Sequence, residues 1–193
     1  MLPQQQKAII RDDARRRRAA LTDRATLSQA IWANLRKLQA FIDAPRIFSY
    51  ANTSTEVETI PFFAEALLAG KTMVLPCTLQ TTLRFFEVTS VATLSPGAYG
   101  ILEPNLETQQ TATPVEPRPG DLVLVPGIAF TSSGIRLGHG AGFYDRFLGV
   151  CDRRIAKAGL AYSAQIFPKL PEEPFDIRVD YLVTEHGATQ CQP

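Results

Sequence analysis

The chain has 193 residues, of which 45% are hydrophobic and 20% are charged. These fractions are typical of a globular protein and predict a single domain over residues 1–193 with a substantial core. No apolar run is long enough to cross a membrane, and the polar, basic start has no apolar region of the kind found in signal peptides, so we expect neither. Three widely spaced cysteines and two histidines leave no zinc-type spacing and favour a reducing, cytoplasmic location.

The net charge of +1 is unevenly distributed along the chain. Residues 1–40 carry nine Lys or Arg against three Asp, a net of +6, and the remainder carries a net of −5. This asymmetry predicts an anionic partner for the N-terminal segment. The candidates are nucleic acid, an anionic surface or a phosphorylated small molecule.

A helix is expected over residues 4–20 because two stripes recur at helical spacing. The basic stripe contains Lys7, Arg11, Arg15 and Arg18, and the apolar stripe beside it contains Ile10, Ala14 and Leu21. The apolar stripe predicts that this helix docks on the protein, with its basic edge facing whatever it docks beside.

A second helix is expected over residues 23–42, ended by Pro45. Its apolar face would consist of Leu27, Ile31, Leu35, Leu38 and Ile42.

Residues 46–51, 72–77 and 83–88 are predicted to form strands. A short helix should separate the first two, with Thr59 as N-cap, Pro61 in the first turn and Gly70 after its end. A strand–helix–strand unit places its two strands parallel. Cys77, at the end of the second strand, is expected to be a small core residue.

Residues 95–120 contain five prolines and are expected to form a long irregular segment, either a functional lid or disordered. Residues 121–126, "DLVLVP", predict a central buried strand. A glycine-rich loop, a helix at 143–149, a strand at 154–160 and a last strand at 179–184 should follow. The order predicts a three-layer α/β fold with a mostly parallel sheet and helices on both faces, Rossmann-like but without the GxGxxG fingerprint.

The segment "RLGHGAGFYDRFL", residues 136–148, has glycines at 138, 140 and 142. It follows the carboxyl end of the predicted central strand, where α/β sheets bind ligands, and it enters a helix whose N-terminus attracts anions. Neither a Walker sequence nor a dinucleotide fingerprint is present. A phosphate cradle and a plain glycine turn are equally compatible with the glycines. The polar residues around them favour the cradle: Arg136, His139, Tyr144, Asp145 and Arg146.

Asp145 allows two interpretations. It is suited to the first turn of a helix or to an ion pair with Arg136 or Arg146. Beside a phosphate site it would instead suit Mg²⁺, which takes one or two carboxylates together with phosphate oxygens. Asp176 or Asp180 would then supply the second carboxylate.

These segments together resemble the 5-formyltetrahydrofolate cyclo-ligase family, also called methenyltetrahydrofolate synthetase, over nearly the whole chain. The long match is residues 121–148, which is highly specific. The shorter ones follow in the family's order: "KAIIR" (7–11), "TEVET" (55–59), "YGILEP" (99–104) and "FDIRVD" (175–180). The chain departs from the family at His139, Ala141 and Phe143, where other residues are common.

The resemblance implies an enzyme of folate one-carbon metabolism that uses ATP and Mg²⁺ to convert 5-formyltetrahydrofolate to 5,10-methenyltetrahydrofolate, ADP and phosphate. The formyl oxygen would attack the γ-phosphate, and the second folate nitrogen would then close the ring and expel phosphate. The substrate supplies the nucleophile, so no catalytic triad is needed. Positioning and charge neutralisation by Arg136 and Mg²⁺ would drive the phosphoryl transfer.

The resemblance also implies roles for individual residues. The ATP-binding residues would be Lys7, Arg11, Arg136, Leu137, Gly138, His139, Gly140, Ala141, Gly142, Phe143 and Tyr144. The folate-binding residues would be Ala51, Glu56, Tyr99, His139 and Phe143. The magnesium ligands would be Asp145 and Asp176.

Two alternatives stay open. One is a non-catalytic RNA-binding relative that uses the Arg-rich helix, although no basic patch interleaved with aromatic residues supports it. The other is a phosphotransferase acting on another small anion. We expect ATP and 5-formyltetrahydrofolate as the only partners, without nucleic acid or membrane, and a monomer or weak dimer.

Overall fold

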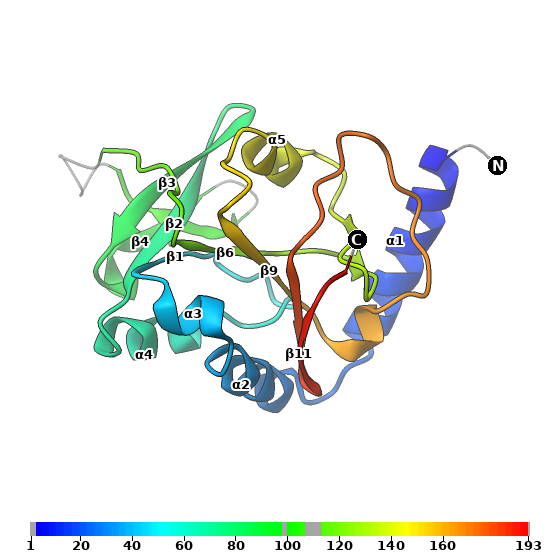
Figure 1. Cartoon of the computed structure of the whole chain (residues 1–193), viewed down its shortest axis with the longest axis horizontal. Helices are drawn as coiled ribbons and strands as arrows, with labels where there is room; N and C mark the ends of the chain where they lie inside the picture. The colour runs from blue at the N-terminus through cyan, green and yellow to red at the C-terminus, as the bar shows by residue number, and fades with distance from the viewer. Residues whose placement is uncertain (1–2, 98–99, 107–112, 193) are drawn as a thin grey trace.

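The computed structural model describes residues 3–97, 100–106 and 113–192. Within them, a central sheet has the strand order β11-β10-β9-β6-β1-β2-β3 (Figure 1). The five inner strands are parallel, and the edge strands β3 and β11 pair antiparallel. The strands are β1 Arg46–Phe48, β2 Thr72–Leu79, β3 Thr82–Val88, β6 Leu122–Val125, β9 Ala156–Leu160, β10 Tyr181–Thr184 and β11 Gly187–Gln190.

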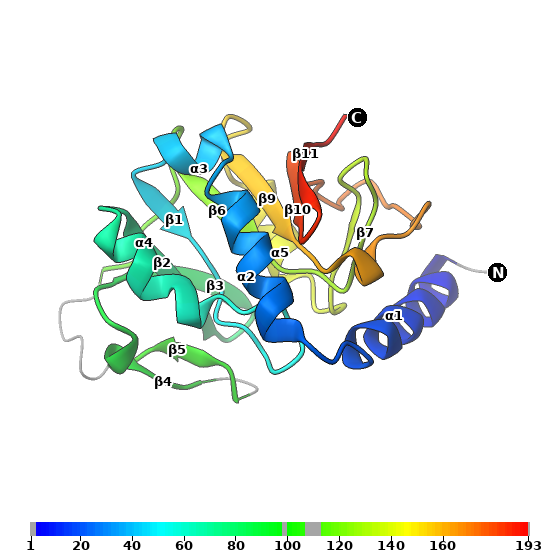
Figure 2. The same cartoon turned by 90° about the horizontal axis from the view of Figure 1, so that it is seen from below.

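Helices cover both faces of this sheet (Figures 1 and 2). One face carries α2 (Arg24–Leu35), α3 (Gln39–Asp43) and the 3₁₀ turn η1 (Ile60–Phe62) that leads into α4 (Phe63–Leu68), and the other carries α5 (Phe143–Gly149). The predicted three-layer α/β fold with a mostly parallel sheet is therefore confirmed. Among the described residues, every helix falls short of the length and hydropathy that a membrane span requires.

The central strand β6 shows why two separate cores form. Leu122 and Leu124 pack under α2–α4, whereas Val123 and Val125 pack under α5. Successive side chains of a strand point to opposite faces, so a fully apolar strand supplies both cores at once. All four side chains have no solvent exposure, which confirms the prediction that "DLVLVP" is central.

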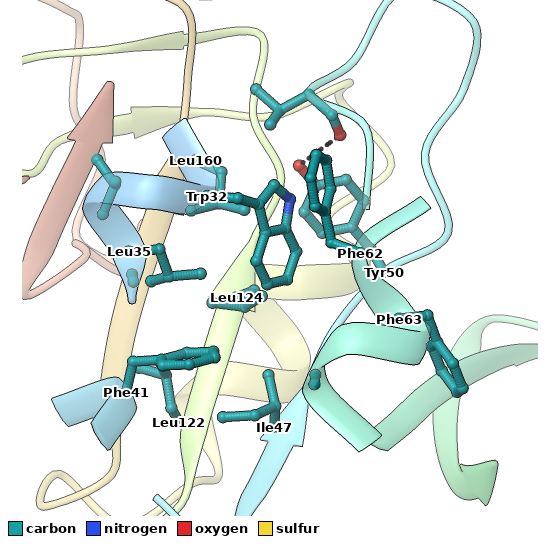
Figure 3. Packing of buried hydrophobic residues seen from close by; sticks show 14 of the residues in the cluster. Trp32, Leu35, Phe41, Ile47, Tyr50, Phe62, Phe63, Leu122, Leu124 and Leu160 are labelled. Atoms are coloured by element: carbon teal, nitrogen blue, oxygen red, sulfur yellow. Dashed lines mark hydrogen bonds between the residues drawn. The ribbon is translucent and has the colours of Figure 1, made fainter. Parts of the chain in front are cut away.

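Trp32 of α2 anchors the larger core (Figure 3). Its ring stacks on Phe62 with centroids 5.1 Å apart and meets Phe41 edge-on at 6.3 Å. Its Nε1 donates to the carbonyl of Glu58 at 2.8 Å, so this buried indole is satisfied while it fixes the loop that follows β1.

Helix α1 (Pro3–Ala19) lies beside the sheet and outside its layers (Figure 2). Its apolar residues Ile10 and Ala14 belong to a third, smaller core with Ile128, Leu137 and Leu170. It also contacts the 3₁₀ turn η4 (Ser163–Gln165). The predicted docking of this helix is confirmed.

The prediction of one helix over residues 23–42 is wrong, because the chain breaks between α2 and α3. Leu38 is extended, with φ −73° and ψ 127°. The break changes the helical phase, so Phe41 enters the core while Ile42 stays 51% exposed.

Other predicted boundaries also require correction. Residues 95–120 are not wholly irregular: β4 (Leu94–Pro96) pairs with β5 (Leu102–Pro104). The region between β6 and α5, expected to be a loop, contains a further pair, β7 (Ala129–Phe130) and β8 (Arg136–Leu137). The strand at 179–184 is not the last, since β11 follows β10. Thr59 makes no side-chain cap, because its hydroxyl donates to the carbonyl of Tyr50.

Two glycines hold the ring of Phe130, which is fully buried on β7. A Cβ added to Gly127 would lie 2.4 Å from that ring, and one added to Gly159 would lie 2.6 Å from it. The ring thus fixes the distance between β9 and the β7–β8 pair that presents Arg136.

We therefore expect Gly159→Ala to destabilise the protein by about 1–3 kcal/mol through overpacking. Gly149→Ala is the matched control, since nothing lies within 4 Å of its added Cβ. Urea unfolding monitored by circular dichroism measures both variants. Equal unfolding midpoints for the two would contradict the tight contact.

Candidate functional site

A cleft lies where the strand order reverses. β1 is followed by β2 on one side of the sheet and β6 by β9 on the other, while β1 and β6 are neighbours. The carboxyl ends of two such strands diverge and leave a crevice. The cleft has a volume of about 710 Å³, which suits small-molecule ligands, and Tyr50, Ala51 and Pro126 line it directly after the two strands.

The cleft brings together nearly all the residues expected to bind ATP, folate or magnesium. Tyr99 lies outside the described residues. The others line the cleft: Lys7, Arg11, Ala51, Glu56, Arg136, Leu137, Gly138, His139, Gly140, Ala141, Gly142, Phe143, Tyr144, Asp145 and Asp176. Residues separated by more than a hundred positions therefore share one site.

The three glycines of the loop serve two different purposes. Gly140 and Gly142 have φ values of +110° and +70°, which side chains rarely adopt. Gly138 has no such φ, but a Cβ there would lie 2.8 Å from Nη1 of Arg136. The glycines thus turn the chain at two positions and make room for a guanidinium at the third.

Arg136 is the central cation of the site. It is 6% exposed, its Nη2 donates to Oδ1 of Asp145 at 2.6 Å, and its Nη1 donates to the carbonyl of Pro126 at 3.4 Å. Nε of Arg136 and Oη of Tyr144 are both buried without a hydrogen-bond partner among the described residues. Each such atom calls for an explanation, such as an ordered water or a ligand that reaches it after a rearrangement.

α1 supplies two further cations. Nζ of Lys7 lies 2.6 Å from Oε2 of Glu173 and 2.7 Å from Oδ2 of Asp176. Burial disfavours the charged form of Lys7, but the hydrogen bonds to Asp176 and Glu173 outweigh it, so its pKa is raised. Nε of Arg11 donates to the carbonyl of Gly138 at 2.9 Å, which ties the helix to the loop.

The helix that follows the glycine-rich loop, α5, is short. It has only seven residues, and its N-cap is Gly142 in a left-handed conformation without a side-chain cap. The side chains of Lys7, Arg11 and Arg136 therefore carry the positive charge of this part of the cleft.

The acidic residues of the site lie close together. Oδ1 of Asp145 accepts from the backbone N–H of Ile177 at 3.3 Å, which places Asp145 next to Asp176 in space. The described residues contain no group of three potential metal ligands; where a bound phosphate adds oxygen ligands, two carboxylates suffice for Mg²⁺. Asp180 is not part of the site: it accepts from Lys157, through the backbone N–H and Nζ.

Glu56 is buried at the other side of the loop. Its Oε2 accepts from the backbone N–H and the hydroxyl of Thr53, both at 2.9 Å, and its Oε1 lies 3.2 Å from Nε2 of His139. Burial alone would raise the pKa of Glu56, but the bonds from His139 and Thr53 outweigh it, so its pKa is lowered and the carboxylate stays ionised.

The loop that carries Glu56 is held by Ser28 and Tyr162, which the sequence analysis did not single out. The hydroxyl of Tyr162 donates to the carbonyl of Glu56 at 3.0 Å, and the hydroxyl of Ser28 accepts from the N–H of Glu58 at 3.1 Å. Arg18 is 5% exposed; burial lowers its pKa, and the negative charge of Glu56 offsets part of that effect. Of Ser28, Tyr162 and Arg18, only Arg18 stood out in the sequence, through its place on the basic stripe of the first helix.

Glu173 and Glu103 are two further cleft residues that sequence reasoning missed. Oε2 of Glu103, on β5, accepts from the N–H of Thr78 at 3.2 Å. Glu103 lies within the quoted "YGILEP", and Glu173 lies three residues before Asp176. These positions, within or close to motifs already quoted, could have indicated both residues as part of the site.

Curated relatives resemble this chain over most of its length. A curated relative from Caenorhabditis elegans, described as a probable 5-formyltetrahydrofolate cyclo-ligase, is 30% identical over 168 residues, covering 82% of this chain and 81% of the relative. The 5-formyltetrahydrofolate cyclo-ligase of Haemophilus influenzae is 29% identical over 179 residues, covering 90% and 94%.

Solved structures agree with these relatives. The structure of Aquifex aeolicus 5,10-methenyltetrahydrofolate synthetase superimposes with a TM-score of 0.83 at 35% identity, covering 97% of this chain and 93% of that one. The model of the 5-formyltetrahydrofolate cyclo-ligase family matches residues 3–185. With its fold, its cleft and this match in agreement, the chain belongs to the 5-formyltetrahydrofolate cyclo-ligase family.

Proposed function

We propose that this protein uses ATP and Mg²⁺ to convert 5-formyltetrahydrofolate to 5,10-methenyltetrahydrofolate, with release of ADP and phosphate. One observation carries the proposal: a single cleft holds three cations suited to phosphate beside a buried, ionised carboxylate suited to the N–H groups of a pterin. Lys7, Arg11 and Arg136 are the cations, and Glu56 is the carboxylate.

The ATP phosphates would bind between α1 and the loop 136–144. Arg136 would use its unpartnered Nε, and Tyr144 its unpartnered hydroxyl, to complete their hydrogen bonding on the ligand. Lys7 and Arg11 would approach from the helix. The rest of the proposed ATP site consists of Leu137, Gly138, His139, Gly140, Ala141, Gly142 and Phe143.

The folate would bind next to the loop that carries Glu56. The ionised carboxylate would accept hydrogen bonds from the pterin ring, while Ala51 and Phe143 would supply apolar contact. His139 belongs to the phosphate loop yet contacts Glu56 at 3.2 Å, so the two binding regions adjoin there. Tyr99, outside the described residues, stays a predicted folate contact.

Asp145 and Asp176 would hold Mg²⁺, which when bound neutralises charge on the transferring phosphoryl group. In the reaction, the formyl oxygen forms a bond to the γ-phosphorus and ADP leaves. The second folate nitrogen then forms a bond to the formyl carbon, and phosphate leaves with the oxygen. The protein's part is to align these groups, exclude water and stabilise the charge, through Arg136 above all.

We also propose one domain over residues 1–193, because the central sheet takes strands from residue 46 to residue 190 and α1 packs back beside it. The proposed partners are the two small-molecule substrates. A cytoplasmic location and a monomer or weak dimer stay predictions.

The direct test mixes the purified protein with Mg²⁺, ATP and 5-formyltetrahydrofolate and follows the absorbance of the methenyl product. Product that forms only with ATP supports the proposal. Phosphate release at the same rate with and without the folate would indicate a phosphotransferase acting on another substrate. Salt-sensitive RNA binding without turnover would indicate a non-catalytic binding module.

A pair of glycine variants tests the phosphate loop. Gly140→Ala places a side chain at φ +110°, and Gly70→Ala does so at φ +78° far from the cleft. Each should lose about 1–2 kcal/mol of stability from backbone strain. Only Gly140→Ala should also lower kcat/KM for ATP, by about tenfold or more, because the loop shifts. Equal kcat/KM in both variants would show that the loop does not bind the phosphates.

Glu56→Gln tests the folate carboxylate. Hydrogen bonds to a charged group contribute about 1.5–3 kcal/mol, so we expect Kd for 5-formyltetrahydrofolate to rise roughly ten- to a hundredfold. Kd for ATP should stay unchanged. Calorimetric titration with each ligand measures the two Kd values. An unchanged Kd for 5-formyltetrahydrofolate would show that Glu56 does not bind the folate.

The same variant has a pH signature in stability. Because the pKa of Glu56 is lowered from its ordinary 4.5, its ionised form stabilises the fold above that pH and loses this effect as the pH falls through the folded-state value. The difference in free energy of unfolding between wild type and Glu56→Gln should therefore shrink below pH 4.5. A difference independent of pH would contradict the lowered pKa.

A further inference from the structure

Phe175 is an aromatic side chain exposed at the cleft. It is 63% exposed and is one of six large, exposed hydrophobic residues among the described parts of the chain. The other five are Ile9, Ile42, Leu68, Leu79 and Val150, none of which lines this cleft. An exposed apolar residue needs no explanation by itself, so its position decides its meaning.

The position of Phe175 links it to the phosphate side of the site. It immediately precedes Asp176, and Nζ of Lys7 lies 5.9 Å from the centroid of its ring. Gln4, one turn earlier on α1, lines the same end of the cleft and donates to Glu173 at 3.4 Å. An open aromatic face next to a phosphate-type cation suits a nucleotide.

α1 defines the order of the groups along the cleft. Lys7 contacts Glu173 and Asp176. One turn later, Arg11 contacts Gly138 of the loop. His139, the next residue of that loop, has its Nε2 3.2 Å from Oε1 of Glu56. Phe175 and Glu56 therefore lie toward opposite ends of this order.

This order fixes the direction of the nucleotide if the proposed function is correct. The γ-phosphate must meet the formyl oxygen of the folate, so it must point toward Glu56. The base, at the far end of ATP from the γ-phosphate, must then lie toward Lys7 and beyond it. Phe175 is the ring located there.

We infer that Phe175 is the stacking platform for the adenine base of ATP and that the cleft end formed by Gln4 and Phe175 is its nucleoside subsite. The inference rests on the proposed function. A flat apolar ring stacks on a base with little regard to the base's hydrogen-bonding pattern, so this subsite favours a nucleoside triphosphate over a bare polyphosphate and tolerates other purines.

The test compares ATP with inorganic tripolyphosphate, each with Mg²⁺, by calorimetric titration of the full chain. Phe175→Ala should weaken ATP binding roughly ten- to a hundredfold and leave tripolyphosphate and 5-formyltetrahydrofolate unchanged. Phe175→Trp should retain ATP binding. Leu68→Ala, which truncates an exposed side chain outside the cleft, is the matched control and should bind all three ligands as wild type does.

Three results would overturn the inference. Unchanged ATP binding by Phe175→Ala would show that the ring does not contact the base. Weaker folate binding with unchanged ATP binding would assign the ring to the folate instead. A wild-type protein that binds neither ATP nor tripolyphosphate would overturn the proposed function itself, and this result is separable because no variant is needed to see it.

Discussion

The ion pairs of Lys7 with Glu173 and Asp176 hold the first helix to the segment before β10, and all three residues line the cleft. They join residues 166 and 169 positions apart, at 2.6 and 2.7 Å. α1 is not part of the sheet layers, and its apolar contacts are limited to the smallest core. A partly buried ion pair is stable only when both partners remain, because a lone buried charge is costly. Together with the bond from Arg11 to the carbonyl of Gly138, these ion pairs tie α1 to the cleft at two points.

The site balances its own charges in the free protein. Arg136 pairs with Asp145, Lys7 pairs with two carboxylates, and Arg11 donates to a backbone carbonyl. This pairing explains how lysine and arginine are tolerated at low exposure, since burial otherwise disfavours their charged forms. Nε of Arg136 and Oη of Tyr144 lack such partners among the described residues, and they identify where the protein alone leaves its hydrogen bonding incomplete.

Local sequence patterns predicted secondary structure and the position of the cleft best where a single physical effect dominates. The apolar run 121–126 predicted a central strand, because a strand buried on both faces has no polar positions. The glycine-rich loop indicated where the cleft lies, because ordering several glycines costs conformational entropy and calls for a structural reason. The helix over 23–42 was predicted wrongly, since the apolar spacing continues through Leu38 while the backbone does not. The β4–β5 pair was missed because short strands with proline carry little periodicity.

The sequence by itself determined the layer order of the fold, the family resemblance and most residues of the cleft, because periodicity and motif spacing are local properties. The tertiary structure decided which side chains of the cleft contact one another. It showed that Gly138 makes room for Arg136, that Glu173 shares Lys7 with Asp176, that Asp180 lies away from the site, and that Phe175 is open to the cleft. Such contacts join segments far apart in the chain, and no local pattern encodes a distance between them.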